Sequence, residues 1–192
     1  MRRLLGLLRK TPVGDAAAPD AVRVLMVCMG NICRSPMAEG VLRARLQQAG
    51  LHTRVLVDSA GTHGYHTGEA PDPRAIRAAA QRSVDLASLR ARPVQPEDFS
   101  RFHWLLAMDQ ANLDWLQSRL PEGAQPRLGL IMEYARRHAG VREVPDPYYG
   151  AAAGFEHVLD LVEDACDGLV ARLSSERTAI PPEPQGRLKQ ST

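Results

Sequence analysis

The chain has 192 residues, which is enough for one domain with a sizeable core. Its formal net charge is +2, and the excess positive charge lies in residues 1–20 and 181–192, so the part between them is close to neutral. A nearly neutral domain excludes a dedicated nucleic-acid binder, because such proteins need a basic face. Three cysteines are too few for a disulfide scaffold, and no apolar run approaches the roughly 18 residues of a membrane-spanning helix.

The two ends of the chain differ in composition from the middle. Residues 1–10 are basic and apolar, but their apolar core of about five residues is shorter than that of a signal peptide. We expect residues 1–20 to form a disordered basic leader and linker, with a short amphipathic segment on a membrane surface as the alternative. Residues 176–192 are rich in Pro, Gln and Ser and predict a disordered tail. The folded domain should span residues 21–175.

Apolar periodicity predicts that strands alternate with helices along this domain. The predicted strands are 22–27, 54–58, 102–108 and 128–132. The predicted helices are 36–50, 73–81, 109–116 and 155–173, with Asp109 as an N-terminal cap and Gly50 as a C-terminal stop. This order indicates an α/β fold, a single-domain three-layer sandwich with helices on both faces of a parallel sheet. Such sheets bind ligands at the carboxyl ends of their strands.

The first predicted strand ends at Cys28, and Arg34 follows just before a helix begins. Backbone N–H groups of a tight loop and of a helix N-terminus converge there, and such an arrangement binds phosphate. The same positive potential favours a thiolate, and a planar guanidinium is able to hold two phosphoryl oxygens. The sequence therefore predicts Cys28 as the nucleophile of a phosphatase. The loop residues expected to bind the phosphate are Met29, Gly30, Asn31, Ile32 and Cys33.

Neighbouring side chains are expected to support this loop. Gly30 and Asn31 tolerate positive φ and are expected to turn their N–H groups inward. We expect Ser35 to direct its hydroxyl at the sulfur, and a hydrogen bond between Asn31 and Ser59 to hold the strained loop. Because a catalytic thiolate needs a reducing compartment, we expect a cytoplasmic protein without stable membrane insertion.

A second loop supplies a candidate general acid, Asp146, which lies between two prolines. This carboxylic acid would protonate the leaving oxygen and then, as a carboxylate, activate the water that cleaves phosphocysteine. Tyr65, Tyr148 and Tyr149 are expected to line a deep slot for a flat ring. A deep slot favours phosphotyrosine, because the side chain of phosphoserine is too short to reach its floor. The scheme requires no metal and no cofactor.

Five motifs, in this order, resemble those of the low-molecular-weight protein tyrosine phosphatase family, in its bacterial type. They are Cys-Met-Gly-Asn-Ile-Cys-Arg-Ser-Pro-Met-Ala-Glu (28–39), Asp-Ser-Ala-Gly-Thr (58–62), Pro-Asp-Pro-Arg (71–74), Met-Asp-x-x-Asn (108–112) and Asp-Pro-Tyr-Tyr (146–149). The resemblance implies a flavodoxin-like fold with four parallel strands and metal-free hydrolysis of phosphotyrosine. It also implies that Cys28, Arg34 and Asp146 act as nucleophile, phosphate clamp and general acid. Short bacterial members often serve tyrosine kinases of exopolysaccharide export, so such a kinase is one candidate partner.

Leu89 departs from the family pattern, and the remaining cysteines and histidines have expected roles of their own. The family commonly places a histidine, which braces the loop asparagine, where this chain has Leu89. Two interpretations stay open: a supporting hydrogen bond is missing, or the register of this segment is shifted. Cys33 is expected either to form a reversible disulfide with Cys28 or to fill space inside the loop. Cys166 is expected in the core. His63, His66 and Glu69 are not expected to bind a metal, because a fourth ligand is lacking.

Four other functions are conceivable for this sequence. Arsenate reduction on the same fold needs two further cysteines downstream, and none lies between Cys33 and Cys166. Protein-arginine phosphatase activity is associated with threonine at the position of Ile32, so isoleucine favours phosphotyrosine. A phosphopeptide-binding module that has lost catalysis stays open because of Leu89. Nucleotide binding is disfavoured, because no glycine-rich phosphate motif of either common type follows the first strand. The oligomeric state stays open.

Overall fold

The computed structural model describes residues 21–175. The predicted leader (residues 1–20) and tail (residues 176–192) lie outside the described residues. Within the described part, no helix has the length and apolarity needed to cross a membrane.

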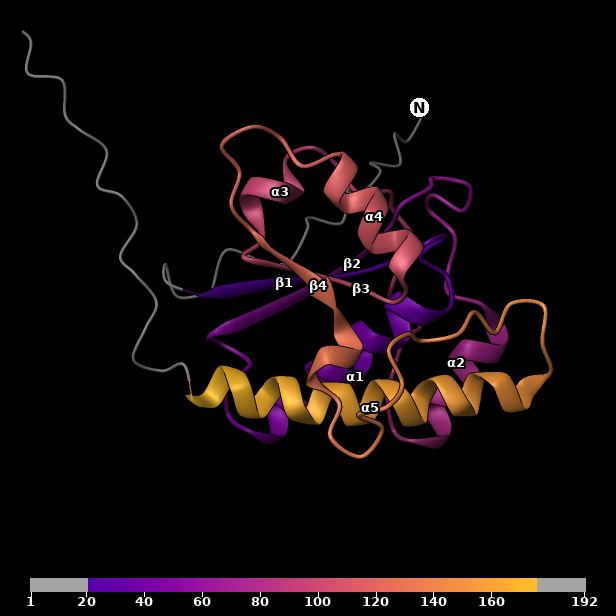
Figure 1. The fold of residues 1–192 in the computed structure, drawn as a ribbon. Helices are drawn as coiled ribbons and strands as arrows, with labels where there is room; N and C mark the ends of the chain where they lie inside the picture. Colours follow the sequence, from indigo (N-terminus) through magenta and orange to yellow (C-terminus); the bar gives the residue numbers. More distant parts are fainter. Residues whose placement is uncertain (1–20, 176–192) are drawn as a thin grey trace, which may run out of the picture.

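Four parallel strands form one sheet in the order β2-β1-β3-β4 (Figure 1). Their bounds are β1 Val22–Cys28, β2 Val55–Gly61, β3 Trp104–Ala107 and β4 Arg127–Leu130. The central strand β1 pairs with both β2 and β3, and its last residue, Cys28, is in register with Gly61. This order is that of a flavodoxin-like sheet, and it confirms the predicted fold class.

Helices cover both faces of the sheet (Figure 1). On one face lie α1 (Arg34–Gln48), α2 (Pro73–Gln81) and the long α5 (Ala152–Ser175), and on the other lie α3 (Asp98–Arg101) and α4 (Gln110–Ser118). Because side chains alternate along a strand, β1 contributes Val24 and Met26 to one core and Leu25 and Val27 to the other. All four are fully buried, as expected for a parallel sheet covered on both faces.

Several element boundaries differ from the prediction. Strand β2 continues to Gly61, beyond the predicted end at residue 58, and β3 is limited to Trp104–Ala107 within the predicted 102–108. The last strand ends at Leu130, and the 3-10 helix η1 (Ile131–Tyr134) takes over the two predicted strand residues that follow, because the Glu133 carboxylate accepts from the Leu130 N–H at 3.0 Å and turns the chain. Helix α1 begins at Arg34 and not at Pro36, and α5 begins at Ala152. The short helix α3 was not predicted, because one turn is too short to show a helical period.

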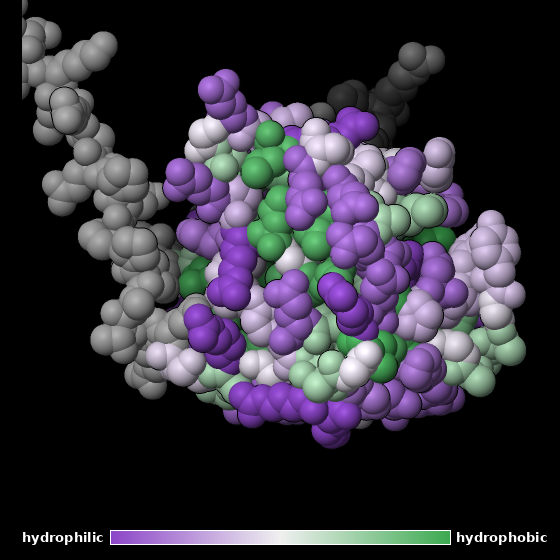
Figure 2. Space-filling view, in the orientation of Figure 1, coloured by the Kyte–Doolittle hydropathy of each residue, from purple (hydrophilic) through white to green (hydrophobic). Residues whose placement is uncertain are grey.

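The face that shows β4 is largely hydrophilic, with hydrophobic side chains visible in its middle, between α4 and α5 (Figure 2). Among the described residues, the exposed large hydrophobic side chains include Met29, Tyr65, Tyr148 and Tyr149, and these four belong to the loops at the carboxyl end of the sheet. Exposed apolar and aromatic surface is therefore concentrated where the fold predicts a ligand site.

Candidate active site

The loop after β1 surrounds the sulfur of Cys28 with hydrogen-bonding groups. The backbone N–H of Asn31 points at the sulfur, with 3.3 Å between the two heavy atoms, and the Ser35 hydroxyl lies 3.0 Å from it. Cys33 occupies the N-cap position of α1 and makes no side-chain capping bond, so it leaves the first N–H groups of the helix to other acceptors. These groups form an anion cradle with the sulfur at its floor.

At two glycines of the cradle and its surroundings, neighbouring groups lie too close to leave room for a side chain. Asn31 takes a positive φ of 56°, as predicted, but Gly30 does not, so that prediction is wrong for Gly30. A Cβ on Gly30 would lie 3.1 Å from Cδ2 of His66, and the missing side chain makes room for this imidazole. A Cβ on Gly61 would lie 2.7 Å from the carbonyl oxygen of Met29, so the cradle and the end of β2 pack backbone against backbone.

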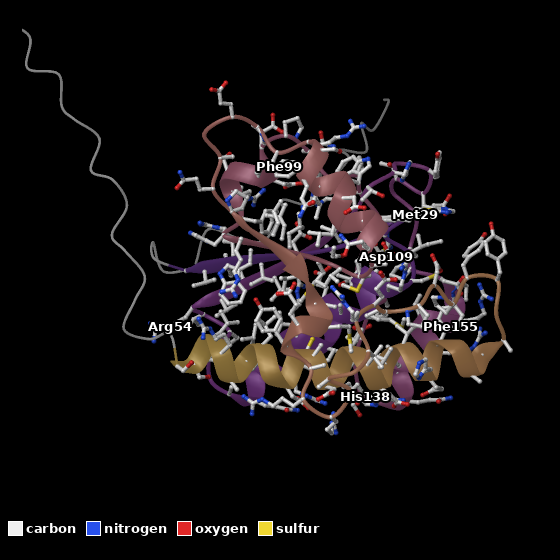
Figure 3. All side chains as sticks on the ribbon, viewed as in Figure 1. Met29, Arg54, Phe99, Asp109, His138 and Phe155 are labelled. Atoms are coloured by element: carbon white, nitrogen blue, oxygen red, sulfur yellow. The ribbon has the colours of Figure 1, made fainter. Side chains whose placement is uncertain are left out.

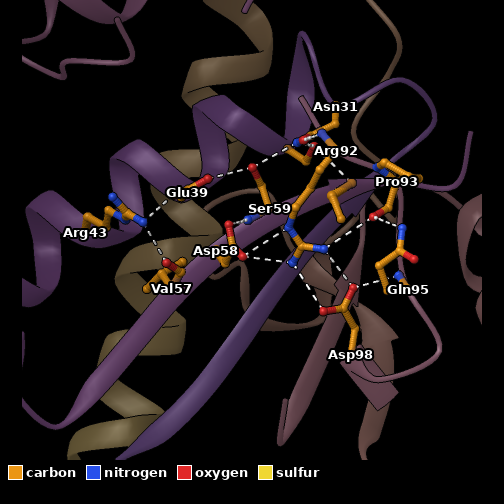
Figure 4. Close-up of polar contacts among 12 residues, drawn as sticks. Asn31, Glu39, Arg43, Val57, Asp58, Ser59, Arg92, Pro93, Gln95 and Asp98 are labelled. Atoms are coloured by element: carbon orange, nitrogen blue, oxygen red, sulfur yellow. Dashed lines mark hydrogen bonds and ion pairs between the residues drawn. The ribbon is translucent and has the colours of Figure 1, made fainter. Parts of the chain in front are cut away.

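The side chain of Asn31 is fully bonded beneath the cradle. Its Nδ2 donates to the hydroxyls of Ser35, at 2.9 Å, and Ser59, at 2.8 Å, so the predicted contact with Ser59 is present. Its Oδ1 accepts from the backbone N–H of Arg92 at 3.0 Å. Leu89 packs against the core. Asn31 makes three hydrogen bonds without a histidine at that position, so its side chain lacks no partner (Figure 4). Asn31 faces the protein interior and not the cavity above the sulfur.

Arg34 is buried and held by two carboxylates. Its Nη1 pairs with Asp109 and also donates to the carbonyl oxygen of Val144 at 3.2 Å, and its Nη2 donates to Asp146 at 2.7 Å. Burial alone lowers the pKa of a guanidinium, but Cys28, Asp109 and Asp146 outweigh it and raise the pKa of Arg34. Arg34 therefore stays charged at the floor of the site.

Asp109 is a residue of the site that the sequence reasoning assigned only to a helix cap. It does cap α4, because its Oδ1 accepts from the backbone N–H of Asn112 at 2.7 Å, and its other oxygen pairs with Arg34. Figure 3 shows Asp109 and Met29 at the same end of the sheet. Asp109 belongs to the Met-Asp-x-x-Asn motif, which could have indicated a role in the site. Helix capping alone was enough to explain an aspartate at this position.

The loop of Asp146 lies beside the cradle and lines the same cavity as Cys28. The Asp146 side chain is 43% exposed, and its Oδ1 accepts from the backbone N–H of Tyr148 at 3.1 Å. Arg74 supports the loop, because it donates to the carbonyl oxygen of Gly150 at 3.3 Å and its guanidinium lies 5.7 Å from the centre of the Tyr148 ring. The carboxylate predicted as general acid thus lies beside the phosphate-binding arginine.

A cavity of about 360 Å³ opens above the sulfur. Its lining includes most of the predicted site residues and also His66, which sequence reasoning did not select. Tyr65 is 75% exposed and Tyr149 is 97% exposed, so these rings lie at the mouth of the cavity and not along a deep wall. The lining residues from the predicted set are Cys28, Met29, Gly30, Ile32, Cys33, Arg34, Tyr65, Asp146, Tyr148 and Tyr149.

His66 lies at the mouth of this cavity, and the sequence did not predict it there. Its ring Nδ1 lies 2.8 Å from a carboxylate oxygen of Glu69, and its position in a loop rich in Gly and His was the only signal. His63 instead bonds to the hydroxyl of Thr62 at 2.9 Å. Among residues 21–175 there is no group of three or more His, Cys, Asp or Glu side chains arranged to hold a metal ion.

The family model of the low molecular weight phosphotyrosine protein phosphatases matches residues 23–179. The chain belongs to this family. A Streptomyces coelicolor relative named as a low molecular weight protein-tyrosine-phosphatase is 44% identical over 156 residues, which are 80% of this chain and 94% of the relative. A Schizosaccharomyces pombe relative named as a low molecular weight phosphotyrosine protein phosphatase is 42% identical over 136 residues, which are 70% of this chain and 85% of the relative.

Solved structures of the family have the same fold. The crystal structure of a protein tyrosine phosphatase from Entamoeba histolytica matches with a TM-score of 0.77 and 38% identity, over 81% of this chain and 98% of that one. The crystal structure of YfkJ from Bacillus subtilis matches with a TM-score of 0.76 and 32% identity, over 82% of this chain and 97% of that one. Family membership therefore agrees with the fold and with an enzyme of the protein-tyrosine-phosphatase class.

Proposed function

We propose that this phosphatase hydrolyses phosphotyrosine in proteins without a metal, through a phosphocysteine at Cys28. The observation that supports this most strongly is the convergence of three groups from three segments: the Cys28 sulfur, the Arg34 guanidinium and the Asp146 carboxyl. A phosphoryl group above the sulfur would meet the backbone N–H groups of the loop and the guanidinium together.

In the first step the Cys28 thiolate attacks phosphorus, and an S–P bond forms while the bond from phosphorus to the tyrosine oxygen breaks. The carboxylic acid of Asp146 gives its proton to the leaving oxygen, so tyrosine departs neutral. A phosphoryl oxygen is expected to take the place of Asp146 on Nη2 of Arg34, since both anions compete for one donor. This exchange would release the Asp146 carboxyl toward the leaving group.

In the second step the Asp146 carboxylate takes a proton from water, and the water oxygen attacks phosphorus. The S–P bond breaks, and inorganic phosphate and the thiolate are formed. The Ser35 hydroxyl, 3.0 Å from the sulfur, is expected to stabilise that thiolate as it leaves. Because the Asp146 carboxylate activates the water, this second step needs no metal.

The cavity supports an aryl phosphate as the substrate. Ile32 lies in the lining, and Tyr65, Tyr148 and Tyr149 surround the mouth, so a phenyl ring would meet apolar and aromatic side chains on its way to the sulfur. Isoleucine at position 32 also favours phosphotyrosine over phosphoarginine, which is the alternative substrate. A tyrosine kinase of exopolysaccharide export is one candidate phosphoprotein partner, and the cytoplasm is the expected location.

Hydrolysis of para-nitrophenyl phosphate and of a phosphotyrosine peptide in the presence of EDTA tests the proposal. Wild type should turn over both, Cys28→Ser should turn over neither, and Asp146→Asn should lose about 10²-fold or more in kcat. Asp114→Asn on the surface of α4 is the matched control and should behave like wild type. Loss of activity in EDTA, or phosphopeptide binding without turnover by wild type, would overturn the proposal.

A further inference from the structure

Within the described residues, the loop that carries Asp146 (residues 144–150) is attached to the rest of the protein at few points. At its start, the buried Val144 donates its backbone N–H to the carbonyl oxygen of Met108 at 2.8 Å and accepts from Arg34 at 3.2 Å. In its middle, the Asp146 carboxylate accepts from Arg34 at 2.7 Å. The other hydrogen bonds of the loop, except one at its end, join residues within it.

Arg74 of α2 makes the attachment at the end of the loop. Its Nη1 donates to the carbonyl oxygen of Gly150 at 3.3 Å, and its guanidinium lies 5.7 Å from the centre of the Tyr148 ring. The same guanidinium lies 4.7 Å from the centre of the Phe155 ring, which is buried near the start of α5 (Figure 3). One side chain therefore joins α2, the Asp146 loop and α5.

Asp72 fixes the plane of this guanidinium. Nε of Arg74 donates to Oδ1 of Asp72 at 3.0 Å, and Nη2 donates to Oδ2 at 2.8 Å, which makes a bidentate pair. The backbone N–H of Asp72 donates to the carbonyl oxygen of Ile32 in the cradle at 2.8 Å. The hydrogen bond to Asp72 also raises the pKa of Arg74, so this side chain stays charged. Arg74 is thus a rigid link between the cradle and the Asp146 loop.

Substrate binding makes the loop more dependent on this link. In the proposed mechanism a phosphoryl oxygen replaces Asp146 on Arg34, so the loop loses its middle attachment when its carboxyl group has to meet the leaving oxygen. Val144 and Arg74 then remain as its attachments. A general acid works only within hydrogen-bond reach of the leaving oxygen, roughly 2.6–3.2 Å. A loop released at one end would therefore lose acid catalysis while the cradle still bound phosphate.

We infer that Arg74 is a positioning residue for general-acid catalysis. It keeps the Asp146 loop beside the cradle while the phosphate of the substrate occupies Arg34. This inference rests on the proposed function, in which Asp146 protonates the leaving oxygen. Arg74 is not one of the residues that line the cavity above the sulfur, so it acts through the loop and not by touching the substrate.

The test compares two aryl phosphates whose leaving groups differ in their need for a proton. Phenyl phosphate releases a phenol with a pKa of about 10, like that of tyrosine, whereas para-nitrophenyl phosphate releases a more acidic phenol that leaves readily as an anion. The measured quantity is the ratio of kcat/KM for para-nitrophenyl phosphate to kcat/KM for phenyl phosphate, because kcat/KM includes the departure of the leaving group. Damage to the fold or to phosphate binding lowers both values and leaves their ratio unchanged.

Five variants are compared with wild type: Arg74→Met, Arg74→Lys, Asp146→Asn, the double variant of Arg74→Met with Asp146→Asn, and Arg77→Met as the control. Arg77 lies exposed on the same helix. Lysine keeps the charge of Arg74, but an ammonium does not span the acceptors on Asp72 and Gly150 as a planar fork does. Thermal melting establishes that each variant is folded before its kinetics are compared.

Arg74→Met should raise the ratio by about tenfold, the effect of losing one hydrogen bond from a charged group. Arg74→Lys should raise it less, and Arg77→Met should leave it unchanged. Asp146→Asn should raise the ratio by itself, and adding Arg74→Met should raise it no further, because no acid is left to position.

An unchanged ratio in both folded Arg74 variants would overturn the inference. So would an equal rise on adding Arg74→Met to wild type and to Asp146→Asn, because Arg74 would then act independently of the acid. An unchanged ratio in Asp146→Asn itself would contradict the proposed function instead, so the two failures are distinguishable.

Discussion

Arg34 is held by two carboxylates that belong to two different segments, and they have different expected roles. Asp146 lies on a partly exposed loop and is expected to move toward the leaving group, whereas Asp109 is anchored at the start of α4 and has no such freedom. A guanidinium that binds phosphate through two N–H groups works only when its plane is fixed. Asp109 is therefore the residue that we expect to set the orientation of Arg34.

Asp109→Asn should lower kcat/KM by about tenfold, because a neutral amide holds a guanidinium less firmly than a carboxylate. Its melting temperature should stay close to that of wild type, because asparagine caps a helix as well as aspartate. Steady-state kinetics with para-nitrophenyl phosphate and a thermal melt measure the two effects. A variant with wild-type kcat/KM would show that Arg34 is oriented without Asp109.

Cys33 lies at the start of α1 within the cradle, and burial, together with Asp72, Cys28 and Asp146, raises its pKa to about 12. It is therefore a protonated thiol at neutral pH and no competitor of Cys28 as nucleophile. If peroxide oxidises Cys28 to a sulfenic acid, the Cys33 thiol is expected to condense with it to a disulfide and release water. Dithiothreitol should then restore full activity to peroxide-treated wild type but not to Cys33→Ser. Equal recovery of both proteins would leave Cys33 as a filler of space.

At the scale of elements, the fold depends on how closely the long helix α5 packs against η1. Gly168 of α5 lies against the backbone of η1, where an added Cβ would come within 1.8 Å of the carbonyl oxygen of Tyr134. A backbone carbonyl cannot turn aside as a flexible side chain can. The gap between α5 and η1 is therefore set by the absence of a side chain at one position.

Gly168→Ala should destabilise the protein by about 3 kcal/mol, although alanine is the better helix former by about 1 kcal/mol. Gly140→Ala is the matched control, because a Cβ there meets nothing within 4 Å, and it should leave the stability close to that of wild type. Urea unfolding measures both. If Gly168→Ala were as stable as wild type, α5 would have to shift easily over η1, contrary to the packing described.

At the scale of the whole molecule, the order of strands and helices followed from the sequence because the apolar runs are long and the turns between them are marked by Gly, Pro and Asp. Cys28 and Arg34 were placed at the carboxyl edge of the sheet for the same reason. Asp146 does not follow a strand directly, and it was assigned because the chemistry needs an acid and because its motif resembles that of the family. The pairing of Asp109 with Arg34 and the positions of His66 and Glu39 could not be derived in this way. Each depends on side chains that meet across segments far apart in the chain, and neither period nor composition records such contacts.

Glu39 on α1 is buried, and its carboxylate accepts from the Ser59 hydroxyl and pairs with Arg43 (Figure 4). Its protonation should appear in the pH dependence of global stability. Its pKa is raised from 4.5 to about 7, so the folded state binds this proton more tightly than the unfolded state does. The resulting stabilisation is complete below pH 4.5 and is lost as pH rises through about 7. The free energy of unfolding of Glu39→Gln, relative to wild type, should therefore increase by roughly 1 to 3 kcal/mol between pH 4.5 and pH 8. Denaturant unfolding at both pH values measures it, and a relative stability independent of pH would show that the carboxylate is not penalised by burial.

In the proposed mechanism, the phosphoryl group is bonded to the sulfur of Cys28 before water removes it. Asp146→Asn should accumulate this intermediate from para-nitrophenyl phosphate, because that leaving group needs little help from an acid, whereas the attack of water has lost its base. The most direct measurement is rapid acid quenching of that variant during turnover, followed by mass spectrometry of its peptides. We expect one phosphoryl group on the peptide that contains Cys28, and none on the corresponding peptide of Cys28→Ser. Phosphate carried by another residue, or turnover by Cys28→Ser, would contradict the account.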